Sequence, residues 1–282
     1  MNDIKYLVIP DVHGRGFWVD PVKDILENTD AKIIFLGDYT DVYLEDFQEI
    51  YGYKLDEEGD YDIKDAPKIG ALLEDTVEML KAIIELKKNN SDRVTLLLGN
   101  HDCGYAISPY ISSSRRDKVR YKNICKLFNE NRELFQLADE AYINDKHFIF
   151  SHAGINKEYA RYCFEDEVNE ENVVRLFNEK YFEDNYGIMD TLGMYSRIRG
   201  KWGGKYGSLV WADALEWITD ESNEAYGYSI VGHTMVSKPI INDKFAFIDN
   251  QQAFVINSNG EIIEYKEYKN GNEGKRDIER SN

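Results

Sequence analysis

Five short segments of the sequence combine glycine with side chains that could bind metal ions or move protons. Four of them contain a histidine, although the whole chain has five histidines. The remaining segment supplies two aspartates instead. The segments are Asp11-Val12-His13-Gly14, Gly37-Asp38-Tyr39-Thr40-Asp41, Gly99-Asn100-His101-Asp102, Ser151-His152-Ala153-Gly154 and Gly232-His233-Thr234. Scattered histidines would rarely give this arrangement, so the sequence predicts that the segments form one site.

The donor groups in these segments indicate a particular class of metal site. They are carboxylates, amides and imidazoles without thiolates, which argues against a structural zinc site built from cysteines. Such a set suits Mn²⁺ best, with Fe and Zn²⁺ as alternatives. Two ions about 3.5–4 Å apart that share a carboxylate would use all the donors. A metal pair of this kind binds a phosphate through two oxygens, so the segments predict phosphate-ester hydrolysis.

Short apolar runs precede the first three segments and predict buried strands. They cover residues 6–9, 32–36 and 94–98. Helices are expected between them, one beginning with Asp20 as N-cap and Pro21 as first helical residue, the other from 65–67 onward. The alternation predicts a parallel α/β sheet covered on both faces. Ligands of such sheets bind outside the carboxyl ends of the strands, where the segments would meet.

The later part of the chain turns from helical patterns to strand patterns. Helices are expected over about 117–135 and 169–182. Strands are expected at 147–151, 228–231, 245–248, 253–256 and 262–265. A Ser258-Asn259-Gly260 turn makes the last two of these a hairpin. His147, the one histidine outside the five segments, lies at the start of its strand and is predicted to be structural.

The chain shows no internal repeat and no clear linker, so we expect one domain with two sheets over residues 1–268. An acidic, tyrosine-rich stretch at 44–64 leaves directly from the second segment and predicts either a solvated insertion or a lid over the site. The charged tail, 269–282, is expected to be frayed. The sequence leaves the oligomeric state open.

The formal net charge of −18 argues against a general nucleic-acid or membrane surface, because a polyanion would be repelled. A metal pair can reverse the sign of the field locally, so a phosphate substrate is still compatible with this charge. The three cysteines form no paired framework, which suits a reducing compartment. Neither a signal-peptide pattern nor an apolar stretch of about 20 residues is present, and we expect a soluble, cytoplasmic protein.

In this order, the motifs DVHG, GDYTD, GNHD, SHAG and GHT resemble those of the calcineurin-like metallophosphoesterases. Within that superfamily they are similar to the phosphoprotein-phosphatase branch, which includes serine/threonine phosphatases and the symmetrical diadenosine tetraphosphatases. The motifs span Asp11 to Thr234. The resemblance implies a four-layer α/β/β/α sandwich of two mixed sheets flanked by helices, two divalent metal ions and phosphoesterase activity.

The resemblance also implies a role for each matching position. Six residues would hold the metal pair, with Asp38 shared between the ions: Asp11, His13, Asp38, Asn100, His152 and His233. A hydroxide bridging the ions would attack phosphorus, and His101 would act as the general acid that protonates the leaving oxygen. Asp41 would orient His101. Asp102 is expected to shape its loop, and the motif glycines are expected to let the backbone approach the ions closely.

The sequence departs from the branch at the arginines that hold the substrate phosphate. Val42 stands where an arginine usually follows Asp41, and no arginine lies between Trp211 and His233. The phosphate must therefore be held by another cation, or be held more weakly.

Arg15 is the favoured candidate for this cation, because only Gly14 separates it from the predicted metal ligand His13. Arg199, in a loop rich in glycine and aromatic residues, is the second. Further candidates are Arg115, Arg116 and Arg197.

The leading hypothesis is a phosphomonoesterase, with phosphoserine or phosphothreonine proteins as its substrates. The alternative is a hydrolase of nucleotides, dinucleoside polyphosphates or RNA ends, which the missing arginine after Asp41 keeps open. A non-catalytic scaffold is disfavoured, because a degenerate member should have lost ligands or the general acid.

Overall fold

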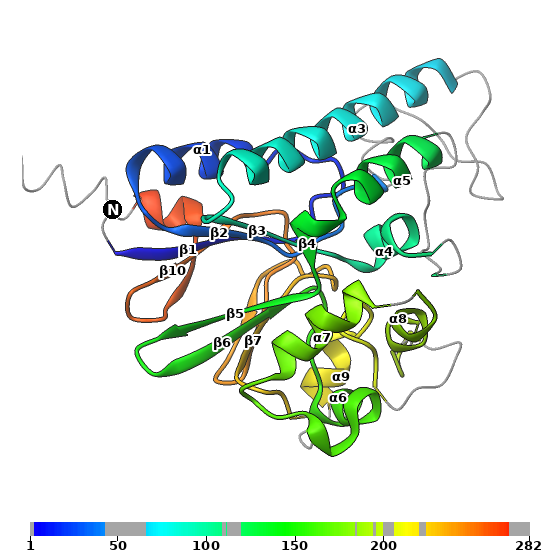
Figure 1. Ribbon diagram of the computed structural model, residues 1–282. Helices are drawn as coiled ribbons and strands as arrows, with labels where there is room; N and C mark the ends of the chain where they lie inside the picture. The colour runs from blue at the N-terminus through cyan, green and yellow to red at the C-terminus, as the bar shows by residue number, and fades with distance from the viewer. Residues whose placement is uncertain are drawn as a thin grey trace, which may run out of the picture.

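The computed structural model describes residues 3–42, 66–108, 111, 120–183, 185–193, 196–199, 206–219 and 224–270, with the backbone alone at 66–75, 185–187 and 190. Two sheets stack on one another between two layers of helices (Figure 1). The expected α/β/β/α class is confirmed. The expected insertion at 44–64 and residues 271–282 of the expected tail (269–282) lie outside the described residues.

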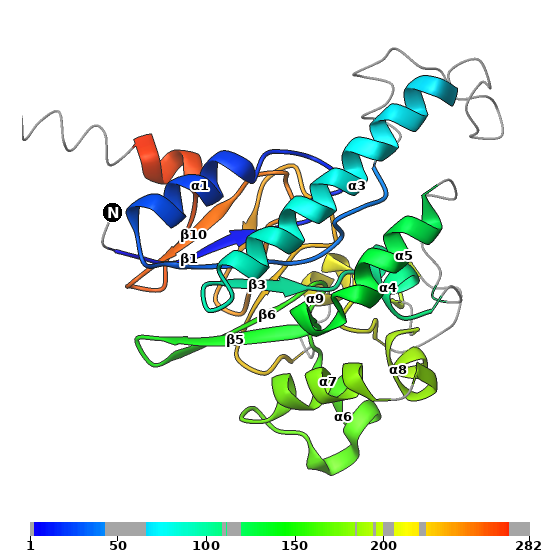
Figure 2. The same cartoon turned by 45° about the horizontal axis from the view of Figure 1, so that its top comes forward.

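The first sheet has the strand order β11-β10-β1-β2-β3-β4. Its strands are β1 (Ile4–Ile9), β2 (Lys32–Phe35), β3 (Val94–Leu97), β4 (Phe135–Gln136), β10 (Phe254–Asn257) and β11 (Ile262–Glu264). Neighbours from β1 to β4 are parallel, and β10 and β11 add an antiparallel edge. Three helices cover its outer face: α1 (Val19–Asn28), α3 (Ala66–Asn89) and α5 (Tyr121–Glu130). In Figure 2, α3 runs across this sheet toward the end where α4 and α5 lie.

The second sheet has the order β5-β6-β7-β9-β8. Its strands are β5 (Ala138–Ile143), β6 (Lys146–Ser151), β7 (Tyr228–Val231), β8 (Ile240–Ile241) and β9 (Phe245–Phe247). Strands β6, β7 and β9 run parallel, so the ends of β6 and β7 lie at the same edge. The helices on its outer side are α6 (Lys157–Phe164), α7 (Val173–Phe182), α8 (Asn185–Leu192) and α9 (Ala214–Thr219).

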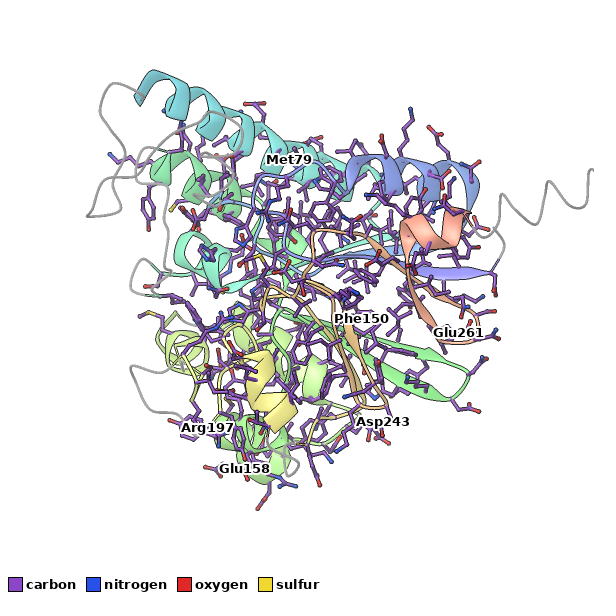
Figure 3. All side chains as sticks on the ribbon, turned by 180° about the vertical axis from the view of Figure 1, so that it is seen from behind. Met79, Phe150, Glu158, Arg197, Asp243 and Glu261 are labelled. Carbon is purple, nitrogen blue, oxygen red and sulfur yellow. The ribbon has the colours of Figure 1, made fainter. Side chains whose placement is uncertain are left out.

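The apolar runs are continuous because both faces of the central strands are buried. In β1, Leu7 and Ile9 pack toward the helices, whereas Val8 faces the second sheet. Successive side chains of a strand point to opposite faces, so a strand between two layers needs apolar residues at every position. Phe150 of β6 belongs to the same inter-sheet cluster as Val8 and lies near the centre of the molecule in Figure 3.

Most of the expected strands occur within two residues of their predicted bounds, but some helix boundaries were wrong. Trp18, and not Asp20, is the N-cap of α1. The helix expected up to 135 ends at Glu130, because Phe135 pairs with β3 as a strand. The helix expected from 169 begins at Val173, because 169–172 form a turn closed by the Asn172 side chain.

Several elements were not expected, including β5 and the helices α4 (Asn100–Ala106), α6, α8 and α9. Strand β5 contains adjacent acidic residues, and α4 is buried on every side, so neither shows a clear amphipathic period. Within the described ranges, no helix is long and apolar enough to cross a membrane.

Candidate metal centre and active site

The five motif segments meet at the carboxyl ends of the strands, and Asp38 lies at the centre of their side chains. Its Oδ2 is 3.5 Å from His13 Nε2 on one side and 3.5 Å from His152 Nε2 on the other. Asp11 Oδ2 lies 3.9 Å from His13 Nε2. His152 Nε2 is also close to two further donors, Asn100 Oδ1 at 2.9 Å and His233 Nδ1 at 3.1 Å. The six predicted ligands therefore form two adjoining groups that share one carboxylate.

Backbone carbonyls fix the orientation of two of the imidazoles. His13 Nδ1 lies 2.8 Å from the Thr40 carbonyl, and His152 Nδ1 lies 2.9 Å from the Leu36 carbonyl. A carbonyl can only accept, so Nδ1 is the donor in both rings, and in the neutral form of each ring Nε2 carries the lone pair. That lone pair faces the carboxylates, as metal binding requires.

The surroundings of one oxygen of Asp11 indicate that these residues fit a metal ion. Asp11 is 1% exposed, and its Oδ1 accepts a hydrogen bond from the His233 backbone, 2.9 Å away. Its Oδ2 is buried and makes no hydrogen bond within the described part of the chain. Burial and the neighbouring Asp38 raise the pKa of Asp11 to about 6. Such a carboxylate is costly without a partner, and a divalent cation between Asp11 and His13 would supply one.

Asp38 is held in its ionised form despite its burial. Burial by itself would raise the pKa of Asp38, but the imidazoles of His152, His101 and His13 outweigh it and lower the pKa. Its Oδ1 accepts the His101 backbone N–H at 2.9 Å, which leaves Oδ2 between the two histidine groups. The carboxylate thus presents one oxygen to both halves of the site.

His233 supplies a neutral ring to the second group. Burial, together with the nearby Arg199, lowers its pKa well below the usual value. A neutral imidazole is the form that binds metal ions, so this environment favours the ligand over the cation.

Four of the site residues have left-handed backbone conformations that are rare for residues other than glycine. The φ angles are 44° at His13, 51° at Asp38, 59° at Asp41 and 62° at His233. Each costs on the order of 1–3 kcal/mol and persists because the surrounding structure holds it. One such restraint is the 2.7 Å hydrogen bond from His13 N to Asp38 O. The sharp turns aim the side chains back over the strand ends.

Two of the motif glycines, Gly99 and Gly232, make room for ligand side chains. A Cβ at Gly99 would lie 2.1 Å from Asp38 Oδ1, and a Cβ at Gly232 would lie 2.2 Å from Asp11 Oδ1. These contacts are shorter than any real carbon–oxygen approach. Each carboxylate is therefore pressed against the backbone of a neighbouring motif.

Replacing Gly99 with alanine should destabilise the protein by about 1–3 kcal/mol and lower its metal content, because Asp38 must move. Urea unfolding and metal analysis of the purified variant measure both effects. Gly16→Ala is the matched control, since its new methyl group would meet Met79 Cε at 4.0 Å, an ordinary distance. Wild-type metal content and stability in Gly99→Ala would contradict the role given to this glycine.

Asp102 shapes the loops, as expected. Its carboxylate accepts hydrogen bonds from the backbone N–H groups of Asp38 at 2.6 Å, Tyr39 at 3.0 Å and Gly99 at 2.9 Å. It therefore joins the turn after β2 to the turn after β3. Because Asp102 is fully buried and occupied by these donors, its carboxylate is turned toward the loop backbone.

His101 lies beside the ligand cluster, in the first turn of α4. Its Nδ1 is 2.7 Å from Asp41 Oδ2, and its ring meets the His13 ring edge to face, with the centroids 5.1 Å apart. Asp41 accepts a hydrogen bond from Nδ1–H, so Nε2 is the atom left for a substrate or a metal. His101 also falls within one of two compact groups of potential ligand atoms, with His13 and Asp38. Asp38, His152 and His233 form the other group.

The candidate arginines differ in their distance from the site. Arg199 reaches it: Nη1 lies 2.7 Å from His233 Nε2, while Nε donates to Asp213 Oδ2 at 2.6 Å. Arg15 is half-buried and close enough to Asp249 to lower the pKa of that carboxyl, which burial raises far more strongly. Arg197 is exposed at the periphery (Figure 3). Arg115 and Arg116 lie outside the described residues.

Two residues with a place at the site were not singled out by the sequence. Asp249 lies two residues after the end of β9 and is 2% exposed, and burial together with the nearby Asp11 raises its pKa well above the usual value. Like the five motif segments, it follows an apolar run, residues 245–248, and this position could have indicated it from the sequence. Tyr105 contacts Asp41 through its hydroxyl. Its spacing of four residues from His101 would have indicated this on a helix, but α4 was not expected.

A two-sheet α/β sandwich with two adjoining histidine–carboxylate clusters at its strand ends defines a dinuclear metallohydrolase. The chain belongs to the calcineurin-like phosphoesterase family, whose model matches residues 4–237. That family uses two divalent metal ions, and the protein is a metal-dependent phosphoesterase. The recognition made from the motifs is confirmed for this family.

The chain is also similar to solved structures at low sequence identity. A cold-active protein-tyrosine phosphatase from a psychrophilic Shewanella species has a TM-score of 0.51 and 13% identity, over 93% of this chain and 80% of that one. A protein serine/threonine phosphatase from Saccharomyces cerevisiae has a TM-score of 0.43 and 14% identity, over 91% and 73%. A search of curated proteins gave no significant match.

Proposed function

We propose that the protein hydrolyses phosphomonoesters with alcohol leaving groups, and that phosphoserine or phosphothreonine in proteins is its substrate class. The observation that carries this proposal is the His101–Asp41 pair beside the metal cluster. An alkoxide is a poor leaving group and needs a proton as the P–O bond breaks, whereas the phosphate released from an anhydride does not. An oriented imidazole is therefore most useful to an enzyme that acts on esters.

Each group of site residues would have a distinct role in such a reaction. Asp11, His13, Asp38, Asn100, His152 and His233 would hold two Mn²⁺ ions, which supply charge for the phosphate oxygens and a nucleophile when bound. His101 Nε2–H would donate its proton to the leaving oxygen. Asp41 keeps the His101 ring turned so that Nε2 faces the substrate. The donor set, half oxygen and half imidazole nitrogen and without thiolates, supports Mn²⁺ over softer ions.

Arg199 is the cation best placed to hold the substrate phosphate, with Arg15 as a second. The Arg199 guanidinium lies against the proposed metal ligand His233 and is oriented by Asp213, so a phosphate at the metals would lie within its reach. In the position where related motifs carry an arginine, Val42 is 9% exposed, and a Cβ at Gly14 would meet its Cγ2 at 2.9 Å. We therefore assign the roles of the two arginines that hold the phosphate in the similar phosphatases to side chains from other loops.

Arg199→Ala should raise KM for a phosphate ester about 10-fold, because a charged hydrogen bond contributes roughly 1.5–3 kcal/mol. Steady-state kinetics with p-nitrophenyl phosphate measure the change. Arg197→Ala, two residues away and exposed, is the control and should keep the wild-type KM. Equal KM values for the two variants would contradict a role of Arg199 in substrate binding.

Hydrolysis of nucleotides or dinucleoside polyphosphates is the second candidate, and the Val42 position favours it over a protein phosphatase. A screen in Mn²⁺ distinguishes the two, using p-nitrophenyl phosphate, phosphoserine peptides, mononucleotides and dinucleoside polyphosphates. We expect turnover of the first two. Turnover of the dinucleoside polyphosphates alone would favour the second candidate, and no turnover of any of them would refute both.

A further inference from the structure

The carboxylate of Asp41 has a hydrogen-bond donor on each of its two oxygens. His101 Nδ1 lies 2.7 Å from Oδ2, and the Tyr105 hydroxyl donates to Oδ1. Asp41 itself is 4% exposed, so protein groups, and not bulk water, set the orientation of its carboxylate. A carboxylate held at one oxygen can rotate about its Cβ–Cγ bond, whereas two fixed donors stop that rotation.

The local structure explains why both donors reach the same carboxylate. His101 and Tyr105 are four residues apart on α4, so their side chains lie on one face of the helix. Asp41 approaches that face from the loop after β2, where its left-handed backbone turns the side chain toward the helix. One helical turn thus carries both the proposed general acid and the second donor to its orienting carboxylate.

The ring of Tyr105 is itself immobilised by aromatic packing. It is 3% exposed, and its centroid lies 5.4 Å from that of Tyr121 and 6.5 Å from that of Phe128. Phe128 is 1% exposed and belongs to the main hydrophobic core. The hydroxyl therefore has a fixed position that is set by the core, and it transmits that position to Asp41.

We propose that Tyr105 is a positioning residue for proton donation by His101. The inference rests on the proposed phosphomonoesterase function and extends it by one residue. In the proposed step, the oxygen of a hydroxide ion forms a bond to phosphorus as the P–O bond to the leaving group breaks, and the electron pair of the broken bond stays on the leaving oxygen. That oxygen takes the proton of His101 Nε2–H, while Nδ1–H stays hydrogen-bonded to Asp41. Tyr105 transfers no proton and acts by holding Asp41, and through it the imidazole, in line with the leaving oxygen.

This role predicts a defect that depends on the leaving group. An enzyme with a misaligned acid should lose activity on phenyl phosphate, whose leaving oxygen needs a proton. It should keep activity on 2,4-dinitrophenyl phosphate, whose leaving group departs as a stable anion. A purely structural role would lower both activities together, because it would reduce the amount of active enzyme.

The test compares Tyr105→Phe with Tyr121→Phe in the full chain with Mn²⁺. Both variants lose one hydroxyl from the same aromatic cluster, but the Tyr121 hydroxyl donates to the Gly104 carbonyl at 3.4 Å and not to Asp41. The readout is the ratio of kcat/KM for the two substrates on one preparation, which cancels any loss of folded protein. We expect the ratio of phenyl to dinitrophenyl activity to fall about 10-fold in Tyr105→Phe and to stay unchanged in Tyr121→Phe.

A double variant shows whether Tyr105 acts through His101. In a His101→Ala background, Tyr105→Phe should cause no further change in the ratio, because the group that it positions is gone. An unchanged ratio in the single variant, or the same fall with and without His101, would overturn the positioning role while wild-type turnover still supports the phosphomonoesterase function. If the wild type hydrolyses neither ester, the proposed function fails and the inference fails with it.

Discussion

Replacing Asp38 with alanine should remove metal binding and phosphoesterase activity together. Its Oδ2 lies 3.5 Å from the ring nitrogens of both His13 and His152, so it is the one carboxylate that the two halves of the described site share. The variant would lose the charge that both ions need. A metal pair provides several kcal/mol of transition-state stabilisation, and about 4 kcal/mol corresponds to a loss of about 10³-fold in kcat/KM.

The measurement pairs metal analysis of the purified variant with kinetics on p-nitrophenyl phosphate. Asp139→Ala is the control, because Asp139 is a half-buried carboxylate that accepts from Thr95 at 2.9 Å and belongs to neither ligand group. It should affect stability and leave the metal content unchanged. A metal-loaded and active Asp38→Ala enzyme would contradict the central position given to this residue.

Replacing His101 with alanine should lower kcat for phenyl phosphate by about 10²–10⁴-fold, the usual contribution of a general acid. The reason is geometric: the ring lies at the edge of the His13 ring, and Asp41 fixes its Nδ1. Activity on 2,4-dinitrophenyl phosphate should change little. Metal content should also stay near the wild-type value, because the proposed acid is not a ligand.

His147→Ala is the matched control for the loss of a histidine. His147 is buried at the start of β6, 2.7 Å from Glu140 and 3.1 Å from Glu170, and its ring stacks on Tyr142. This placement agrees with its expected structural role, and the variant should keep its activity at a temperature where it is folded. A loss of metal in His101→Ala would instead make His101 a ligand, which its proximity to His13 and Asp38 also allows.

The strands were predictable because burial on both faces leaves a direct trace in the sequence. Ile33, Ile34 and Phe35 are all apolar because β2 lies between helices and a second sheet. Helix starts were less predictable, since Trp18 is not a usual N-cap residue and the Asn172 side chain makes no capping hydrogen bond. Helix α4 gave no amphipathic pattern because all its residues are buried.

The sequence by itself determined which groups could form the metal site and in what order they follow the strands. Each motif is local: a ligand, a glycine and a strand end lie within a few residues, and parallel strands bring such ends to one edge. The family followed from this order alone, and its model matches the chain.

The tertiary structure decided the contacts between motifs, because these join residues that are far apart in the chain. The His233 backbone meets Asp11 across 222 residues, and Tyr105 meets Asp41 across 64. Arg199 lies against His233 through a contact that no spacing predicts. These contacts depend on how the two sheets stack and on where each loop meets the others. Both are properties of the packed core and not of any single segment.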